Sequence, residues 1–196
     1  MTTTTPVRDW VDPTCPWAWQ TSVWLRGLRD AGVITLGWNV FSLELSAMPG
    51  EPFDVVASRA SEALRALVLA ATDGGPQGFE RLYEAMGLRI HARREGISPE
   101  VVRAAAADVG MPGVIDRAIA DDKWSHAVVA AHGEAHELGV FGVPTISIAG
   151  SKVIYGPVVA RPPSGSDALA LWEHTRWLAE RKDFFELKRW RDQRPD

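Results

Sequence analysis

Cysteine is almost absent from this chain of 196 residues, which contains Cys15 alone. A single cysteine cannot close an internal disulfide, so stabilisation by disulfides within the chain is excluded. This usage is typical of a protein that works in a reducing cytoplasm. Any chemistry of sulfur must therefore come from Cys15 or from a molecule that the protein binds.

Long apolar runs and an excess of positive charge are absent as well. No stretch approaches the ~20 apolar residues of a membrane helix, and residues 1–6 carry neither the basic nor the apolar part of a signal peptide. The formal net charge of −4 and the pI near 5.7 argue against general nucleic-acid binding, which needs a basic surface. We therefore expect a cytoplasmic protein with no membrane and no nucleic-acid partner.

Tyrosine is scarce whereas tryptophan is abundant, with two and nine residues respectively. Four of the tryptophans lie close to Cys15 in the sequence, namely Trp10, Trp17, Trp19 and Trp24. We expect Trp10 and Trp24 to pack in the core, as large aromatic side chains do. Trp17 and Trp19 are expected at the floor of a cleft, where they would stack a flat aromatic substrate.

The first part of the chain predicts a βαβ unit. Residues 7–11 and 33–41 are apolar and β-branched, and they flank a helix that begins at Pro16. Two strands joined by one helix favour parallel pairing. Near the other end, residues 145–149 and 152–155 predict an antiparallel hairpin, and a helix over about 166–182 follows it.

The middle of the chain has a different texture. It is rich in Ala, Arg, Glu and Leu at helical spacing, with no strand pattern. Glycine and proline break this region into four or five helices, with the breaks at residues 73–76, 96–99 and 110–112. We therefore predict an α/β fold in which residues 1–43 and 139–196 form one domain, and residues 44–138 form an all-helical insertion that acts as a lid.

Cys15 stands at the predicted start of the first helix. Pro16 suits the first helical position, because its φ is fixed and its missing N–H costs nothing there, so Cys15 becomes the N-cap. The free N–H groups and the positive dipole end of a helix favour a thiolate at this place. The alternative is a buried cysteine that behaves as a small hydrophobic residue.

A second informative stretch is Val143-Pro144-Thr145, which precedes the predicted hairpin. Proline removes a hydrogen-bond donor from a sheet and therefore belongs at the start of a strand or at an edge. The same three residues would also fit a proline that merely starts a strand. The stretch indicates a functional site only because it follows the helical segment and precedes the predicted hairpin.

Together these features resemble the DsbA family of thioredoxin-fold proteins that carry a helical insertion, and most of all the actinobacterial mycothiol-dependent nitroreductase group. The resemblance extends along the whole chain, and it is carried by Asp12-Pro13, Cys15-Pro16-Trp17, Leu82 to Gly87, Arg89-Ile90-His91, Gly142 to Thr145, Tyr155 to Val158 and Phe184 to Arg189. It implies a thioredoxin-like fold with a helical insertion.

The resemblance also implies the site. Cys15 would be the nucleophile, and Pro144 would form a cis peptide bond opposite the cysteine helix, so that the backbone of Val143 can pair with a thiol-bearing substrate. Mycothiol or another low-molecular-weight thiol would be the co-substrate. The expected thiol-binding residues are Pro16, Trp17, Val143, Pro144, Thr145 and His91, and no metal is expected.

This chain departs from the group at Ala18, where the members carry the second cysteine of Cys-Pro-Trp-Cys. An internal disulfide cycle is therefore excluded. We predict a monothiol oxidoreductase in which Cys15 attacks an oxidised or electrophilic small molecule, such as a nitroaromatic or quinone-like compound. A mixed disulfide between Cys15 and mycothiol would result, and a second mycothiol would then resolve it, since thiol exchange needs only an attacking thiolate, an accessible sulfur and a leaving group.

Two alternatives stay open. One is a thiol-conjugate transferase or isomerase, similar to the kappa glutathione transferases and the 2-hydroxychromene-2-carboxylate isomerases, in which the bound thiol does the chemistry. The other is a binding protein without catalysis on a degenerate redox scaffold. The sequence does not fix the physiological substrate or the oligomeric state, for which a homodimer is one alternative.

Several polar residues are weaker candidates. His91 and Arg89 could line the cleft above Cys15 or lie on the surface. His132 and His136 have a spacing that can hold zinc, but no third ligand is evident and a solvated helix face is favoured. Asp12 would orient a proton near the thiol or cap the strand, and Thr14 would donate a hydrogen bond to the thiol.

Overall fold

The computed structural model describes residues 4–47, 51 and 61–195. The strands are β1 (Thr5–Val11), β2 (Ile34–Val40), β3 (Thr145–Ile148) and β4 (Ile154–Tyr155). The helices are α1 (Pro16–Asp30), α2 (Leu43–Ser46), α4 (Glu62–Gly87), a π-helical turn η1 (Leu88–Ala92), α5 (Pro99–Asp108), α6 (Val114–Ile119), α7 (Lys123–Glu137) and α8 (Gly165–Ala179). The first residues of the predicted helical stretch, 54–60, lie outside the described residues.

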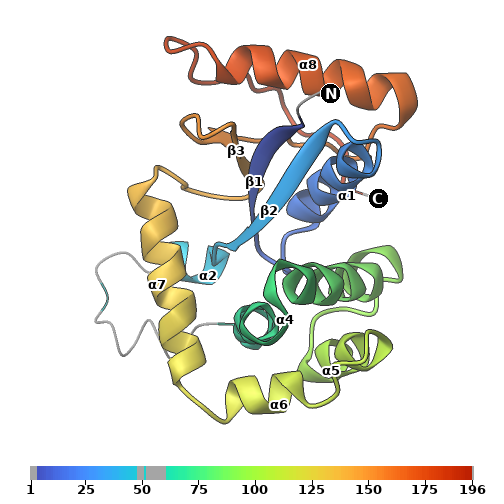
Figure 1. The fold of residues 1–196 in the computed structure, drawn as a ribbon, viewed down its shortest axis with the longest axis vertical. Coiled ribbons are helices and arrows are strands. Elements are labelled where there is room, and N and C mark those ends of the chain that lie inside the picture. Colours follow the sequence, from blue (N-terminus) through green and yellow to red (C-terminus); the bar gives the residue numbers. More distant parts are fainter. Residues whose placement is uncertain (1–3, 48–50, 52–60, 196) are drawn as a thin grey trace.

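The four described strands form one mixed sheet in the order β2-β1-β3-β4. β1 runs parallel to β2, with Val7 opposite Leu36, and antiparallel to β3, with Val7 opposite Ile148. β3 and β4 form the predicted antiparallel hairpin. The predicted βαβ unit and hairpin are therefore confirmed, and they meet at β1 in the middle of the sheet (Figure 1).

The segment between β2 and β3 is helical wherever the structure describes it as regular. Figure 1 shows α4, α5 and α6 below the sheet and α7 leading back toward β3. The predicted break at residues 73–76 is a kink inside α4, because Gly75 has φ 63° and ψ −160° and Pro76 follows it. Such a backbone conformation suits glycine, which lacks a Cβ. The short helix α2 has no counterpart among the predicted elements, and Ser42 caps it by accepting a hydrogen bond from the Leu45 N–H.

Several tryptophan side chains are buried in the core. Trp10 and Trp24 are buried as predicted, and the Trp24 indole N–H donates to the Ala168 carbonyl of α8 over 3.1 Å. Trp19 is also buried, at 5% exposure, where it contacts Tyr83 edge-on. The prediction that Trp19 lies at the floor of a cleft is therefore wrong, because the side chain fills the junction between α1 and α4.

One hydrophobic cluster joins the sheet to the helical segment. It combines Val11, Trp19 and Val40 with apolar side chains of α4, α5, α6 and α7. A second cluster packs Trp24 and Leu28 of α1 against the sheet and Trp172 of α8. The helical segment therefore shares its core with the strands, and burial of this shared apolar surface is the main source of stability.

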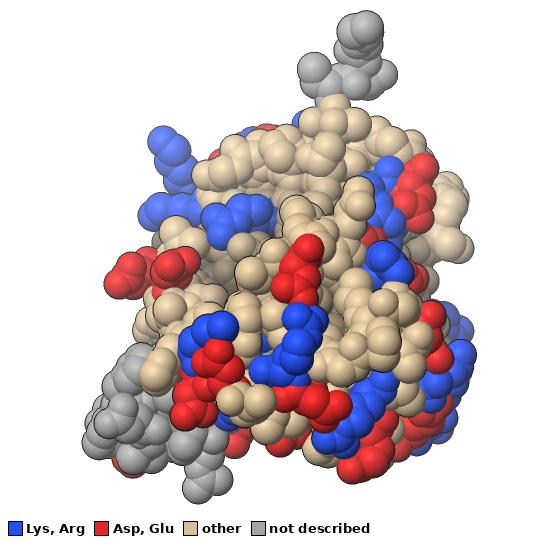
Figure 2. All heavy atoms as spheres, turned by 60° about the horizontal axis from the view of Figure 1, so that its bottom comes forward, with Lys and Arg blue, Asp and Glu red and all other residues tan. Residues whose placement is uncertain are grey.

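Charges of both signs mix on part of the surface. On the lower part of the face in Figure 2, basic and acidic side chains are interspersed. Some of the charges form ion pairs, such as Arg103 with Asp116 and Arg117 with Asp73. None of the described helices has the length and apolar character that a membrane crossing requires.

Candidate active site

Cys15 is the N-cap of α1, as the sequence predicts. Its backbone is extended, Pro16 occupies the first helical turn, and the Sγ atom accepts a hydrogen bond from the Ala18 N–H over 3.4 Å. The turn before it is closed by a hydrogen bond from the Cys15 N–H to the Asp12 carbonyl over 3.0 Å. The sulfur therefore has a fixed position near the end of β1.

Asp12 holds the turn that carries Cys15. Its Oδ1 accepts hydrogen bonds from the Thr14 N–H (2.8 Å) and the Thr14 hydroxyl (2.7 Å), and its Oδ2 accepts one from the Leu43 N–H (2.9 Å). Of the two roles considered for Asp12, the structure therefore shows the cap at the end of β1. The expected hydrogen bond from Thr14 to the thiol is replaced by one to Asp12.

The cysteine turn meets the loop before β3. The Val143–Pro144 peptide bond is cis, as the resemblance implies. The Cys15 thiol donates to the Val143 carbonyl over 3.6 Å, which joins residues 128 positions apart in the sequence. The Thr145 hydroxyl donates to the Gly142 carbonyl over 2.7 Å and fixes the loop from the other side of the proline. The structure thus brings Cys15 and residues 143–145 together.

The environment of Cys15 favours the protonated thiol. Burial raises the pKa of Cys15, and the nearby Asp12 carboxylate adds to that effect. The N–H groups of Ala18 and Trp17 and the charge of Arg191 oppose it. The sequence predicts a favoured thiolate from the helix start alone. That prediction is wrong for the structure described, because desolvation of the sulfur outweighs the helix N-terminus.

A large cavity of about 730 Å³ lies beside the cysteine turn. Its walls include Trp17 of α1, Val143 of the cis-proline loop, Tyr155 of β4 and a C-terminal segment, defined as residues 184–193. Cys15 itself is only 5% exposed and does not contribute to the wall. Trp17 therefore lies in a cleft as predicted, while Cys15 is buried and reaches the cavity wall through its hydrogen bond to Val143.

His91 and Arg89 take other positions than the cleft lining. The His91 Nε2–H donates to the Pro13 carbonyl over 2.9 Å, and the ring stacks on Trp19 with centroids 6.3 Å apart. Burial lowers the pKa of His91. The Arg89 guanidinium pairs with Asp108 and Glu95. His91 thus contacts the turn that carries Cys15 from the side of the helical segment.

His132 and His136 form no metal site with other described residues. The described part of the chain contains no group of three or more His, Cys, Asp or Glu side chains placed to hold a metal ion. His132 is half-buried rather than solvated, since its Nδ1 accepts a hydrogen bond from the Ser42 N–H over 3.3 Å and its ring packs on Phe41. It joins α7 to the residue that caps α2.

Sequence reasoning missed Asp9 and Arg191. Asp9 is completely buried in β1, and neither of its carboxylate oxygens has a hydrogen-bond partner among the described residues. Burial raises the pKa of Asp9 well above its usual range, opposed by the charge of Arg26. An aspartate between Val7 and Val11 of an apolar strand is the signal that could have identified it. Arg191 gives no such signal, because its contacts depend on where the end of the chain folds back.

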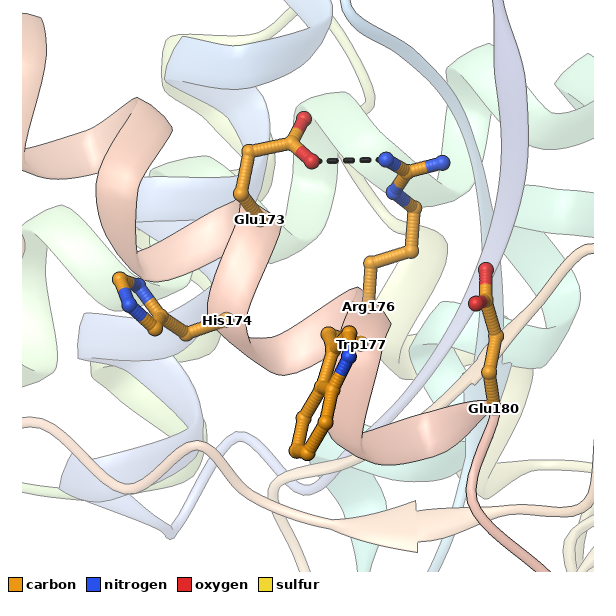
Figure 3. A pocket seen from close by; sticks show the side chains of 5 residues that line it. All are labelled: Glu173, His174, Arg176, Trp177 and Glu180. Atoms are coloured by element: carbon orange, nitrogen blue, oxygen red, sulfur yellow. Dashed lines mark hydrogen bonds and ion pairs between the residues drawn. The ribbon is translucent and has the colours of Figure 1, made fainter.

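A second hollow, of about 310 Å³, lies on α8 (Figure 3). Its five lining side chains come from that helix and its C-terminal end, and Glu173 pairs there with Arg176 over 2.7 Å. Trp177 is 56% exposed, and the His174 Nδ1–H donates to the Ala170 carbonyl of the same helix. The lining of this hollow comes from one helix and its end, whereas the larger cavity is lined by Val143, whose carbonyl accepts the hydrogen bond from Cys15, and by Trp17 of the cysteine helix. The cavity beside Cys15 is therefore the candidate active site.

Comparison with known families gives one match that covers most of the chain. Residues 14–189 match the Rv2466c-like family, described as mycothiol-dependent nitroreductase Rv2466c. A curated relative, the uncharacterized protein Rv2286c of Mycobacterium tuberculosis, is 35% identical over 183 residues, which cover 91% of this chain and 79% of the relative.

Solved structures with the same architecture are more distant in sequence. SCO1869 of Streptomyces coelicolor, described as a probable DsbA oxidoreductase, is similar with a TM-score of 0.61 at 17% identity over 93% of this chain and 94% of that one. The thiol-disulfide exchange protein α-DsbA2 of Wolbachia pipientis gives 0.59 at 15% identity over 90% and 83%. A 2-hydroxychromene-2-carboxylate isomerase gives 0.59 at 16% identity over 88% and 94%. These likenesses show a DsbA-like thioredoxin fold.

Proposed function

The chain belongs to the Rv2466c-like family of mycothiol-dependent nitroreductases, and we propose that it is a cytoplasmic monothiol oxidoreductase. Cys15 is the nucleophile in this proposal, and a low-molecular-weight thiol such as mycothiol supplies the second sulfur. The observation that carries the proposal is the position of Sγ, held between the Ala18 N–H and the Val143 carbonyl beside a large cavity.

The first step makes a mixed disulfide. The Cys15 thiol, which donates a hydrogen bond to the Val143 carbonyl in the resting protein, loses its proton to solvent, and the thiolate attacks one sulfur of a disulfide substrate. The substrate disulfide breaks as the Cys15–substrate disulfide forms, and the leaving thiolate takes up a proton. The Ala18 N–H remains in place to stabilise negative charge on Sγ before the attack.

The second step releases the enzyme. A thiolate of mycothiol attacks the substrate sulfur of the mixed disulfide, the Cys15 sulfur leaves, and it regains its proton. The substrate leaves as a disulfide with mycothiol, so one disulfide is consumed and one is formed. An internal thiol would compete for this step in a Cys-Pro-Trp-Cys protein, but Ala18 has no sulfur to offer.

The thiol co-substrate binds along the surface formed by the cysteine turn and the cis-proline loop. Trp17 and Val143 line the cavity directly. Pro16 precedes Trp17, and Pro144 and Thr145 follow Val143 in the chain, so their proposed role is to hold these two residues in place. His91 is expected from the sequence to bind the thiol, and we propose that it instead acts through its hydrogen bond to Pro13.

The cavity suits a small molecule with a flat apolar part. Aromatic side chains in its wall include Trp17, Phe141 and Tyr155, and the last two are stacked on each other with centroids 5.3 Å apart. Apolar pockets with a few polar groups are typical of small-molecule sites. Small oxidised molecules with a flat aromatic part are therefore the proposed substrates. A disulfide reacts by the two steps above. With a nitroaromatic, the Cys15 thiol and one mycothiol thiol together supply two electrons and two protons: the nitro group becomes a nitroso group and water, and Cys15 becomes its mixed disulfide with mycothiol. A second mycothiol then releases Cys15 and leaves as mycothiol disulfide. No metal takes part in the proposal.

A thiol-conjugate transferase or isomerase is the second candidate. The observation that favours it is the buried Cys15 with a raised pKa, hydrogen-bonded as a neutral thiol to Val143. Such a residue can help to hold another thiol without becoming the nucleophile. In this case the external thiol attacks the substrate, and Cys15 is a neighbour of the reacting sulfur.

Mass spectrometry of the intact protein tests the proposal. The protein is incubated with oxidised mycothiol, and Cys15→Ser serves as the control. The expected result is one mycothiol adduct on the wild type that reduced mycothiol removes, and none on Cys15→Ser. Absence of the adduct would contradict the monothiol route. Mycothiol-dependent turnover that survives in Cys15→Ser would favour the transferase, and unchanged ligand binding without any turnover would favour a scaffold without catalysis.

A further inference from the structure

The end of the chain returns to the cysteine turn. After α8 the chain continues without regular secondary structure, and residues 184–193 line the cavity beside Cys15. The match to the family ends at residue 189, so the last part of this segment lies beyond the family match.

Arg191 makes two contacts across the cavity. Its guanidinium carbon lies 5.1 Å from the centroid of the Trp17 ring, a cation–π contact. Its Nη2 donates to the Tyr155 hydroxyl over 3.2 Å. Trp17 belongs to α1 and Tyr155 to β4, so one side chain spans both sides of the site.

The contact with Trp17 brings the guanidinium of Arg191 to the first turn of α1, the helix that Cys15 caps. Trp17 is two residues from Cys15, and its ring is the surface on which the guanidinium lies. The charge of Arg191 lowers the pKa of Cys15, against the effects of burial and of Asp12. The N–H groups of Ala18 and Trp17 act in the same direction as Arg191. The C-terminal segment thus supplies a cation that the helix start does not contain.

We propose that Arg191 is a positioning residue that stabilises the thiolate of Cys15 and holds Trp17 and Tyr155 together at the mouth of the cavity. The inference rests on the proposed role of Cys15 as nucleophile. Arg191 is exposed, so water and salt weaken its field, and its effect on the sulfur is modest. Arginine suits the place better than lysine, because its planar group can stack on an indole and donate a hydrogen bond together.

The test measures the reactivity of the Cys15 sulfur and does not require enzymatic turnover. The rate of alkylation of Cys15 by iodoacetamide, a neutral reagent, is followed from about pH 6 to about pH 11, a range that spans the usual pKa of a thiol, in the full-length protein and in Arg191→Ala. Arg194→Ala, which removes the same charge from an exposed residue of the same tail, is the matched control. Arg191→Lys keeps the charge, and Tyr155→Phe removes only the hydroxyl that receives the hydrogen bond.

The expected result is an alkylation profile displaced to higher pH in Arg191→Ala, with a rate about two- to fivefold lower below the midpoint. Arg194→Ala should match the wild type, and Arg191→Lys should recover part of the loss. The difference should shrink in about 1 M salt, where exposed charges are screened. A merely structural role for the side chain would change none of these profiles in a salt-dependent way.

Equal profiles for Arg191→Ala and Arg194→Ala would overturn the inference. So would a displacement that salt does not alter. These outcomes are distinguishable from a failure of the proposed function, because alkylation reports on Cys15 without mycothiol or substrate. A displaced profile in a protein that forms no mycothiol adduct would support the placement of Arg191 while contradicting the monothiol route.

Discussion

Neighbouring groups act in opposite directions on the protonation of Cys15. The Ala18 N–H, 3.4 Å from the sulfur, and the charge of Arg191 favour the thiolate, whereas burial and Asp12 favour the thiol. The thiol is the favoured form, and its proton is directed to the Val143 carbonyl. A buried sulfur of this kind resists unspecific oxidation, because the thiolate is the reactive form. The proposed reaction therefore needs a step in which the Cys15 thiol loses its proton before it attacks.

Asp9 gives a prediction at the same scale. Its carboxyl is buried without a hydrogen-bond partner among the described residues, and its pKa is raised well above the usual range. The folded protein then keeps a proton that the unfolded chain releases near about pH 4. The free energy of unfolding should consequently fall as the pH rises from about 4 through the pKa of the folded state, by up to ~1.4 kcal/mol per pH unit.

The substitution Asp9→Asn should remove this dependence, since the amide does not titrate. We expect urea unfolding to give similar stabilities for the two proteins at low pH and a growing advantage for Asp9→Asn as the pH rises. Asp30→Asn, on an exposed residue at the end of α1, is the control. Parallel stability curves for wild type and Asp9→Asn would show that Asp9 is not protonated in the folded protein.

At the scale of elements, the contact between α1 and α4 depends on one glycine. A Cβ atom added at Gly87 would lie 2.1 Å from Cε3 of Trp19. Trp19 is buried against Tyr83 and is therefore restricted in its movement. Gly87→Ala should destabilise the protein by on the order of 1–3 kcal/mol, as overpacked cores do.

Gly27→Ala is the matched control, because a Cβ at Gly27 in α1 would meet nothing within 4 Å. Alanine is the better helix former, so this variant should gain about 0.5–1 kcal/mol. Urea unfolding followed by tryptophan fluorescence measures both variants. A Gly87→Ala protein as stable as Gly27→Ala would mean that α4 can shift away from Trp19 at little cost.

Most elements can be predicted because their signals are local. Cys15-Pro16 marks the start of α1, and apolar, β-branched stretches mark the strands. The kink at Gly75 is predictable as a break but not as a bend within one helix, since glycine and proline indicate only that the helix is interrupted, without indicating whether it resumes. The π-helical turn η1 has no comparable signal, because its residues would also fit an ordinary helix.

At the scale of the whole molecule, the helical segment predicted as a separate lid shares its hydrophobic core with the sheet. Its helices share a hydrophobic cluster with Val11 of β1 and Val40 of β2. None of the described residues in the range 44–138 lines the cavity beside Cys15, so the predicted lid does not cover that cavity with them. We propose that the described helices of this range form one core with the strands, and that residues 1–43 and 139–196 do not fold separately from them. The position of His91 against Pro13 is one consequence, since it links the helical segment to the cysteine turn.

The candidate site can be predicted only in part, because its members come from distant parts of the chain. Cys15 and the Val143-Pro144-Thr145 stretch are recognisable from their neighbours in sequence. The direction of the pKa shift of Cys15 is not, since it depends on how deeply the folded chain buries the sulfur. The place of Arg191 depends on the path of the C-terminal segment, which has no regular structure to predict.

The second sulfur of the proposed reaction comes from outside the protein, and restoring an internal one is the sharpest test of that proposal. Cys15 is loaded as its mixed disulfide with mycothiol, excess reagent is removed, and the intact mass is followed in wild type, Ala18→Cys and Ala18→Ser. Position 18 is suitable, because the Ala18 nitrogen lies 3.4 Å from Sγ.

We expect the wild type and Ala18→Ser to stay loaded until reduced mycothiol is added. Ala18→Cys should release mycothiol unaided and end as the internal disulfide. A wild-type adduct that disappears without added thiol, or an Ala18→Cys adduct that is as long-lived as the wild-type one, would contradict the proposal that a thiol from solution replaces the missing cysteine.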